Sequence, residues 1–185
     1  HPFVARRFGF SHDDLDRLAD LVGAAAIRWG INPEHRGRFG LSDIHQNTWQ
    51  LGVQRLLLGE ALSADHLASV GIVSTVDDVT STDTALVGAL AELVSRTARL
   101  VRSFAVDGSV ADWVTRLRQA VEQLADVPFA EGWQLAQVWA VLESIEARAA
   151  AAAARLAPSD ALALLTDAFA ERGLRPAFGS GALVV

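Results

Sequence analysis

The strongest constraint on the fold is an apolar spacing of four and three residues in the second half of the chain. Over residues 83–104 this spacing is met by Leu86, Leu90, Leu93, Leu100 and Phe104, and Thr97 fills the one remaining place. The same spacing runs from Val110 to Leu124, after Ser109, a residue type that often caps helices. Side chains spaced in this way lie on one face of an α-helix. The pattern predicts two amphipathic helices, over 83–104 and 110–126.

Four other segments carry helical signals. Ser11 precedes three nearby carboxylates and an apolar stripe, which predicts a helix over 12–26. Further helices are expected over 47–58, ended by Gly59, over 130–154, with its alanine run, and over 159–172, ended by Gly173. The sequence therefore predicts an all-α fold, a helical bundle of five or six helices.

The remaining segments predict loops and one strand. Residues 27–45 contain three glycines and one proline, and we expect an ordered loop there, anchored by its apolar side chains Trp29, Ile31, Phe39 and Leu41. Residues 60–81 predict irregular structure. After Pro176 a glycine turn leads into Ala182-Leu183-Val184-Val185, which predicts a short strand beginning at the C-terminus. A lone strand needs partners, so we expect the chain to be a piece of a larger protein.

Composition excludes several classes of function. The 185 residues are 51% hydrophobic and 21% charged, which is typical of a folded domain. All 16 basic residues are arginine, so phosphate-loop lysines and Schiff bases are excluded, and the lack of cysteine excludes thiolate chemistry. A net charge of −6 argues against a free-standing nucleic-acid binder. No apolar run approaches the ~18 residues of a membrane span, so we expect a cytoplasmic protein without a membrane partner.

The sequence predicts no catalytic, cofactor-binding or metal-binding residue. The five histidines form no HExxH motif, and none is three or four residues from another on a predicted helix. The four aspartates between residues 13 and 20 suit the start of a helix better than a cation site. Gly179 and Gly181 lack the third glycine of a dinucleotide-binding fingerprint. We therefore expect no cofactor and no small-molecule substrate.

Seven residues are candidates for contact with DNA or with a partner protein. They lie in two polar-flanked stretches and one cationic segment: Arg28, Trp29, Arg36, Arg38, Gln46, Asn47 and Trp49. The two indoles could lock a loop to a helix, which is the simpler interpretation. The arginines could touch phosphate or an acidic partner surface, and a solvated loop face is equally consistent with them.

Several blocks of sequence resemble the RecC family, the gamma subunit of exodeoxyribonuclease V. The blocks are Phe8-Gly9-Phe10 with Asp13-Asp14-Leu15, then Ile27-Arg28-Trp29-Gly30-Ile31 with Glu34-His35-Arg36, then Gln46-Asn47-Thr48-Trp49, and then Gly52-Val53-Gln54-Arg55-Leu56-Leu57-Leu58-Gly59. The first 60 residues carry the specific signal. Farther on, the helix entry Ser109-Val110-Ala111-Asp112-Trp113 and the tail from Phe178 agree with the family.

This resemblance implies a fragment of an inactivated superfamily 1 helicase-like subunit. RecC-like proteins lack the ATPase motifs and serve as a scaffold in the RecBCD helicase–nuclease, which unwinds and degrades DNA ends for recombinational repair. By this resemblance, residues 1–176 form the second inserted (2B) helical subdomain, and 177–185 start the strand that returns to a helicase-like core domain. The expected partners are RecB-like and RecD-like subunits and DNA, reached through the full-length protein.

The leading hypothesis is a non-catalytic structural and interaction subdomain of RecC. The alternative is an autonomous helical adaptor or regulator whose exposed helix seam binds another protein. A small enzyme with a pocket between helices ranks last, because the periodicity shows no convergent polar groups.

Overall fold

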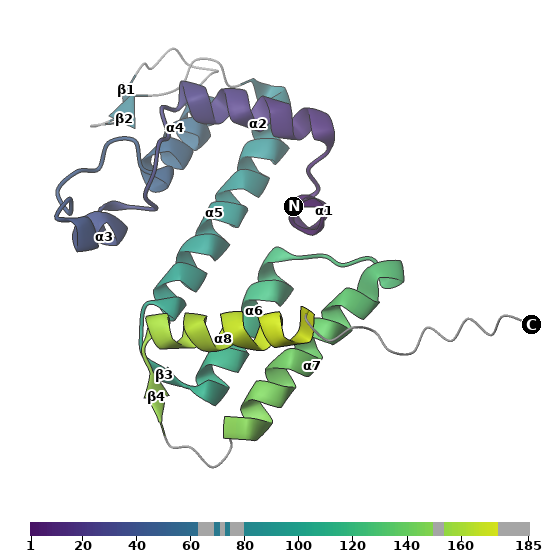
Figure 1. Ribbon diagram of the computed structural model, residues 1–185. Coiled ribbons are helices and arrows are strands. Elements are labelled where there is room, and N and C mark those ends of the chain that lie inside the picture. The colour runs from purple at the N-terminus through teal and green to yellow at the C-terminus, as the bar shows by residue number, and fades with distance from the viewer. Residues whose placement is uncertain (63–68, 71–72, 75–79, 150–153, 174–185) are drawn as a thin grey trace, which may run out of the picture. The chain divides into compact units, whose positions relative to one another are not determined.

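The computed structural model of the protein describes residues 1–62, 69–70, 73–74, 80–149 and 154–173 (Figure 1). Within these residues the chain forms eight α-helices: α1 (Pro2–Phe8), α2 (His12–Ala24), α3 (Pro33–Arg36), α4 (Trp49–Leu62), α5 (Thr84–Phe104), α6 (Val110–Leu124), α7 (Gly132–Ala149) and α8 (Pro158–Gly173). Three short 3-10 helices are η1 (Gly37–Phe39), η2 (Ser81–Asp83) and η3 (Phe129–Glu131). The predicted all-α fold is confirmed.

In the described part of the chain, four two-residue strands form two antiparallel pairs. Strand β1 (Ser69–Val70) pairs with β2 (Val73–Ser74), and β3 (Gly108–Ser109) pairs with β4 (Arg155–Leu156). None of these strands was predicted from the sequence. The strand predicted over 177–185 lies outside the described residues.

The predicted helices are confirmed with corrections at their ends. Helix α4 continues past Gly59 to Leu62, because the residues that follow this glycine have good helix propensity and outweigh its cost. Helix α7 ends at Ala149, and Ala154 is not helical, so the prediction of a helix through the whole alanine run was too long. Helices α1 and α3 were not predicted, since they are too short to show an apolar period.

Side-chain caps explain where α2 and α6 begin. Ser11 Oγ accepts the backbone N–H of Asp14 at 3.1 Å, and the Asp14 carboxylate accepts the backbone N–H of Ser11 at 2.8 Å. Ser109 and Asp112 make the same reciprocal pair at the start of α6. Each pair satisfies two backbone donors that the first helical turn leaves unpaired. The expected cap at each of these two serines is confirmed.

The chain folds as two compact units. Unit 1 comprises His1–Arg99 together with Gln123–Asp126, and unit 2 comprises Leu100–Glu122 together with the described residues from Val127 onward. The division therefore falls within α5 and within α6. Each unit has a hydrophobic cluster of its own.

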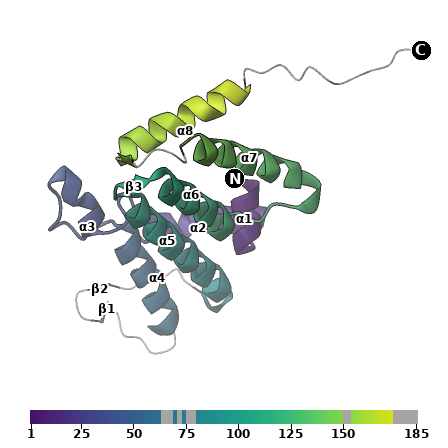
Figure 2. The same cartoon turned by 90° about the horizontal axis from the view of Figure 1, so that it is seen from below.

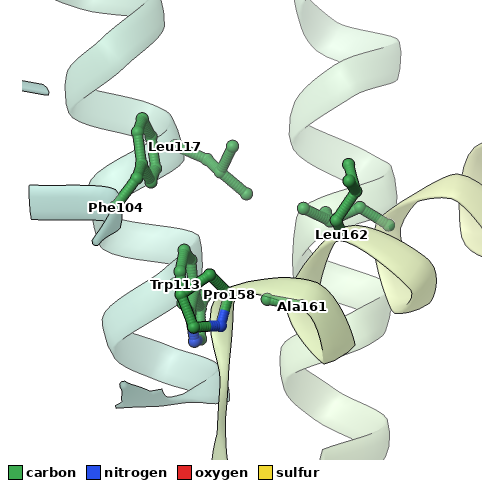
Figure 3. A pocket seen from close by; sticks show the side chains of 7 residues that line it. Phe104, Trp113, Leu117, Pro158, Ala161 and Leu162 are labelled. Carbon is green, nitrogen blue, oxygen red and sulfur yellow. The ribbon is translucent and has the colours of Figure 1, made fainter. Parts of the chain in front are cut away.

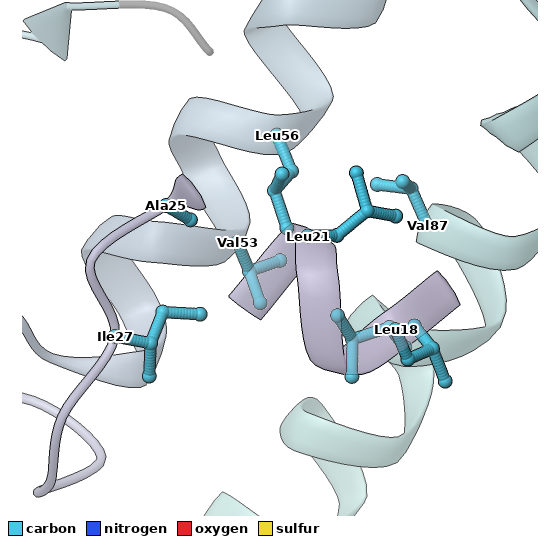
Figure 4. Packing of buried hydrophobic residues seen from close by; sticks show 8 residues of the cluster. Leu18, Leu21, Ala25, Ile27, Val53, Leu56 and Val87 are labelled. Carbon is cyan, nitrogen blue, oxygen red and sulfur yellow. The ribbon is translucent and has the colours of Figure 1, made fainter. Parts of the chain in front are cut away.

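The core of unit 1 joins α2, α4 and α5 (Figure 4). Its buried members are Leu18, Leu21, Ala25, Ile27, Val53, Leu56, Val87 and Leu90. Leu21, Leu56 and Val87 are fully buried. Because burying a leucine side chain is worth about 1.5–3 kcal/mol, this cluster contributes strongly to the stability of unit 1.

An ion pair ties α2 to the start of α5. Arg17 donates from Nε to Asp83 Oδ1 at 3.0 Å and from Nη2 to Asp83 Oδ2 at 2.7 Å. The backbone N–H and the hydroxyl of Thr80 also donate to Asp83 Oδ2, both at 2.9 Å. The hydrogen bond from Arg17 is the main reason that the pKa of this carboxyl lies far below its usual range, and the Thr80 bonds act in the same direction against the opposing effect of burial. Asp83 is therefore a charged group held inside unit 1.

Helix α4 packs closely against Ile27 because residue 52 is glycine. A Cβ atom on Gly52 would lie 2.1 Å from Ile27 Cγ1 and 2.5 Å from Ile27 Cδ1. Both of these atoms belong to a core side chain that is 4% exposed. This close packing depends on the absence of a side chain at residue 52.

Gly52→Ala is expected to destabilise the protein by about 1–3 kcal/mol, because the new methyl group overpacks the core against Ile27. The matched control is Gly88→Ala on the exposed side of α5, where a Cβ meets no atom within 4 Å. That control should stabilise by up to about 1 kcal/mol through helix propensity. Urea unfolding followed by circular dichroism measures both changes. Equal changes in the two variants would contradict the close contact with Ile27.

The core of unit 2 joins α6, α7 and α8: α8 crosses the other two helices in Figure 1 and lies on one side of them in Figure 2. Its buried members are Val114, Val141, Leu142, Ile145 and Ala168. Beside it, Trp113 stacks on Phe104 with 6.0 Å between ring centroids and 6° between ring planes. The Trp113 indole N–H donates to the Leu156 carbonyl at 3.2 Å, so the ring is fixed at its polar end.

Among the described residues, no helix combines the length and the apolar character that crossing a membrane requires.

Candidate functional site

All seven residues singled out from the sequence belong to unit 1, where they lie in or next to one loop. We call residues 27–48 the tryptophan–arginine loop; it contains α3 and η1. The first and last segments of the loop lie side by side. Arg28 N–H donates to the Asn47 carbonyl at 3.0 Å, and Trp49 N–H donates to the Gly30 carbonyl at 3.0 Å. A third bond runs from Gln50 N–H to the Ile31 carbonyl at 2.9 Å. The two polar-flanked stretches are thus brought together.

Left-handed backbone conformations shape both ends of the loop. Gly30 has a φ of 76° and Asn47 a φ of 61°, and these two residue types tolerate that region best. Directly after Asn47, the buried Thr48 begins α4: its hydroxyl accepts Leu51 N–H at 3.3 Å and donates to the His45 carbonyl at 2.9 Å. Thr48 was not predicted as the cap, although Thr at this place is an ordinary helix-start signal.

Arg36 organises the loop from inside. This residue is 2% exposed. Its Nη1 donates to the carbonyls of Ile44 at 3.0 Å and Gln46 at 2.8 Å, and its Nη2 donates to the carbonyl of Trp29 at 2.6 Å. Its Nε has no hydrogen-bond partner. One guanidinium group therefore donates hydrogen bonds to three backbone carbonyls of the loop. A single lysine ammonium does not reproduce this geometry.

Gly30 makes room for this arrangement. A Cβ atom at Gly30 would lie 2.7 Å from Arg36 Nε and 3.0 Å from Arg36 Cγ. Glycine is thus required here twice, for its positive φ and for the space that the arginine occupies.

Two aromatic rings and two arginines form a row on the loop. Arg36 Cζ lies 4.6 Å from the centroid of the Trp29 ring, and the Trp29 ring meets that of Phe39 edge to face at 5.5 Å. Arg38 Cζ lies 4.8 Å from the centroid of the Phe39 ring. We call these four residues the aromatic–arginine row. Cation–π contacts of this kind hold the rings in place.

The row is open to solvent at its aromatic members. Trp29 is 41% exposed and Phe39 is 57% exposed. Phe39 was expected to anchor the loop and does not; the loop is held by Arg36 and by its backbone hydrogen bonds instead. It was also absent from the candidate residues, although its position beside Arg38 in the cationic segment could have indicated a surface role.

The other candidate residues differ in exposure. Arg28, Arg38, Gln46 and Asn47 are exposed. Arg38 also contacts His35, with 3.2 Å between Nη2 and the imidazole Nε2. Trp49 is half-buried and lines an apolar pocket of about 280 Å³ with Ile31 and four residues of α5: Leu90, Leu93, Val94 and Thr97. This pocket offers apolar contact and no group suited to catalysis.

The exposed part of the loop carries charges of both signs beside the two aromatic rings. The exposed charges on it are Arg28 and Arg38, with Glu34 and Asp43 of opposite sign. Aromatic faces beside guanidinium groups suit stacking with bases or packing against a protein. Among the described residues, no group of three His, Asp or Glu side chains is placed to hold a metal ion.

Comparison with known proteins places the chain in a family. Residues 1–173 match the family described as the fourth domain of the RecBCD enzyme subunit RecC. The RecBCD enzyme subunit RecC of Mycobacterium tuberculosis (strain CDC 1551 / Oshkosh) is 38% identical over 183 residues, which cover 98% of this chain and 16% of that protein. The chain therefore spans about one sixth of the length of the curated relatives that it matches most fully.

Two further relatives carry the same name. RecC of Mycolicibacterium smegmatis is 36% identical over 182 residues, which cover 98% of this chain and 16% of that protein. RecC of Escherichia coli (strain K12) is 29% identical over 113 residues, which cover 61% of this chain and 10% of that protein.

Proposed function

Because the chain belongs to the RecC family, we propose that it is a non-catalytic structural and interaction subdomain of a RecC protein that works within a RecBCD complex. In that role it helps to hold the complex together and to shape the path of DNA while DNA ends are unwound and degraded for recombinational repair. The family match over residues 1–173 is the observation that supports this context. The assignment of 1–176 to an inserted 2B subdomain, with 177–185 leading to a core domain, belongs to the same proposal.

We further propose that the aromatic–arginine row is a contact surface of this subdomain and that it contacts DNA in the assembled complex. The observation that carries this step is that two exposed rings are held by two guanidinium groups, one of which is fixed on three carbonyls. Stacking on such rings is worth about 1–3 kcal/mol per base, and it needs no particular base sequence. The net charge of −6 opposes the phosphate backbone, so the contact is expected to be local and to depend on the rest of the complex.

The test uses full-length RecC reconstituted with RecB and RecD. Trp29→Ala and Phe39→Ala, made together, should weaken binding to a DNA end by about tenfold or more, which corresponds to the loss of one or two stacked bases. The matched control is Arg102→Ala, which removes an exposed arginine on α5 and should leave the affinity unchanged. Gel filtration of the three subunits together shows whether the complex still assembles.

The outcomes separate the two kinds of partner. Weaker DNA binding by a fully assembled complex supports the DNA contact. Loss of assembly with unchanged DNA binding by the residual complex would assign the row to a partner subunit instead, and no change in either measurement would reject the row as a contact surface. The alternative of an autonomous helical adaptor predicts that the gene encodes no helicase-like domain on either side of this segment, which sequencing of the gene decides.

A further inference from the structure

The outer face of α8 in unit 2 is apolar and uncovered within the described chain. Ala161 and Ala168 face the core and are 2% and 8% exposed, whereas Leu162 is 67% exposed and Phe169 is 42% exposed. Residues seven apart on a helix lie almost one above the other, so Leu162 and Phe169 form a single stripe. Exposed large side chains that line up in this way mark interaction sites more often than isolated ones do.

A pocket opens next to this stripe (Figure 3). It has a volume of about 240 Å³ and is lined by Phe104, Trp113, Leu117, Pro158, Ala161, Leu162 and Leu165. The Trp113 N–H is already bonded to the Leu156 carbonyl, and its ring is stacked on Phe104, so this wall of the pocket is apolar. The volume lies below the ~300–1,000 Å³ of small-molecule sites and suits one large apolar side chain.

Small residues complete the face. Ala163, Thr166 and Ala170 are exposed and lie between the apolar stripe and the opposite edge of the helix. The Thr166 hydroxyl donates to the Leu162 carbonyl at 2.8 Å, so its hydrogen is already bonded within the helix. A second helix can therefore approach the α8 backbone closely.

The opposite edge of α8 is acidic. Asp160, Asp167 and Glu171 are exposed and follow one another at spacings of seven and four residues, which places them on one side of the helix. The sequence of α8 contains one basic residue, Arg172. The described ion pair at this edge is a long one, 3.8 Å between Arg148 Nη1 and Glu171 Oε2, and both side chains are more than half exposed. The edge thus keeps most of its negative charge.

We infer that the outer face of α8 and the adjoining pocket form a docking site for an amphipathic helix of a partner protein that carries Lys or Arg along one edge. The partner places a large apolar side chain in the pocket, packs its apolar face on Leu162 and Phe169, and sets its basic edge against Asp167 and Glu171. This site goes beyond the proposed function, because it does not involve the aromatic–arginine row and takes a different kind of partner.

The negative charge along the edge of α8 favours a basic helix over DNA, a membrane surface or a second copy of the chain. The acidic edge repels the phosphates of DNA and the anionic head groups of a membrane surface. A second copy of α8 would bring an equally acidic edge to the contact, which like-charge repulsion disfavours. A basic amphipathic helix matches both the apolar stripe and the charge.

The test measures binding of two labelled synthetic peptides to the 185-residue chain by fluorescence anisotropy. Each peptide is an amphipathic helix of about five turns with leucines at spacings of three and four. One carries lysines along one edge of the leucine face, and the other has glutamates at the same positions. The lysine peptide should bind at least about tenfold more tightly than the glutamate peptide at low salt, and the difference should shrink as salt is added.

Two variants of α8 locate the site. Asp167→Lys combined with Glu171→Lys should reverse the preference between the two peptides, and Leu162→Asp should weaken the lysine peptide by about tenfold or more. All three positions are exposed, and circular dichroism melts check that the variants remain folded. Trp29→Ala should have no effect, so failure of this inference is distinguishable from failure of the proposed DNA contact.

Three results would overturn the inference. One is equal binding of the two peptides. Another is a charge preference that the α8 substitutions do not alter. The third is a dimer of the chain in sedimentation that Leu162→Asp dissociates, since a second copy would then be the occupant of the face.

Discussion

Arg36→Leu is expected to lower the free energy of unfolding by about 3–5 kcal/mol, because three backbone carbonyls that lose their donor each cost about 1–3 kcal/mol. The three are the carbonyls of Trp29, Ile44 and Gln46, which the buried guanidinium joins. Leucine is apolar and shorter than arginine, so it restores none of these bonds. Urea unfolding followed by tryptophan fluorescence measures the change.

A local measurement shows whether the effect arises in the tryptophan–arginine loop. The amides of Arg28, Trp49 and Gln50 hold the two ends of the loop together, and their hydrogen exchange should accelerate in Arg36→Leu. Arg36→Lys should recover only part of the lost stability, since an ammonium group cannot reach three separated carbonyls as the planar guanidinium does.

Arg38→Ala is the matched control, because Arg38 is an exposed arginine two residues away. It should cost less than about 1 kcal/mol, as surface charges generally do. If Arg38→Ala and Arg36→Leu cost the same, the guanidinium of Arg36 does not organise the loop.

Asp83→Ala is expected to destabilise the protein by about 3–4 kcal/mol at pH 7, near the lower end of the range for breaking a buried ion pair, because Arg17 can regain some water. The Asp83 side chain is 7% exposed, and that of Arg17 is 35% exposed. The substitution also removes the acceptor of two hydrogen bonds from Thr80 at the start of α5. The exposed Asp16→Ala serves as a control and should change stability by less than about 0.5 kcal/mol.

The stabilisation that Asp83 provides should decrease as the pH is lowered. Arg17 holds the pKa of this carboxyl below its usual range in the folded protein, so the folded state favours the charged form. The stabilisation is therefore complete above the ordinary aspartate pKa of ~3.9 and is lost as the pH falls below it. The difference in stability between the native chain and Asp83→Ala should shrink between pH 5 and pH 2, measured by urea unfolding at each pH. A difference that stays constant over this range would contradict the ion pair.

The long helices could be predicted from the sequence because their signals are local. In α5 and α6 the four-three spacing continues for several turns, and Ser109 supplies the capping oxygen, so residues within one or two turns carry the information. The short helix α1 shows where local signals are too few to predict a helix. It has Pro2 at its first position and Gly9 in a left-handed conformation just after its end, which are ordinary signals, but seven residues are too few for an apolar period to emerge.

The role of Arg36 shows why the candidate site could be predicted only in part. In the sequence, Arg36 belongs with Arg28 and Arg38 to one cationic segment, because the three residues are alike in type and close along the chain. The structure separates them: Arg36 is buried and the other two are exposed. Its acceptors are backbone oxygens seven to ten residues away, and every residue type has such an oxygen.

The exposed apolar face of α8 could not be predicted from the sequence pattern either. Its leucines, alanines and phenylalanine are spread around much of the helix, so the pattern does not tell the buried side from the exposed one. Packing against α6 and α7 decides that Ala161 and Ala168 turn inward and that Leu162 and Phe169 remain outside.

By itself the sequence determined that this chain is helical, that it contains no lysine or cysteine chemistry, and that its motif blocks are those of the RecC family, because residue type and local spacing carry that information. Only the tertiary structure decided which arginine is buried inside the loop, which aromatic rings reach the surface, and which side of α8 the described residues leave uncovered. The physical reason is that burial and backbone hydrogen bonds depend on segments distant in the chain that meet only when it folds.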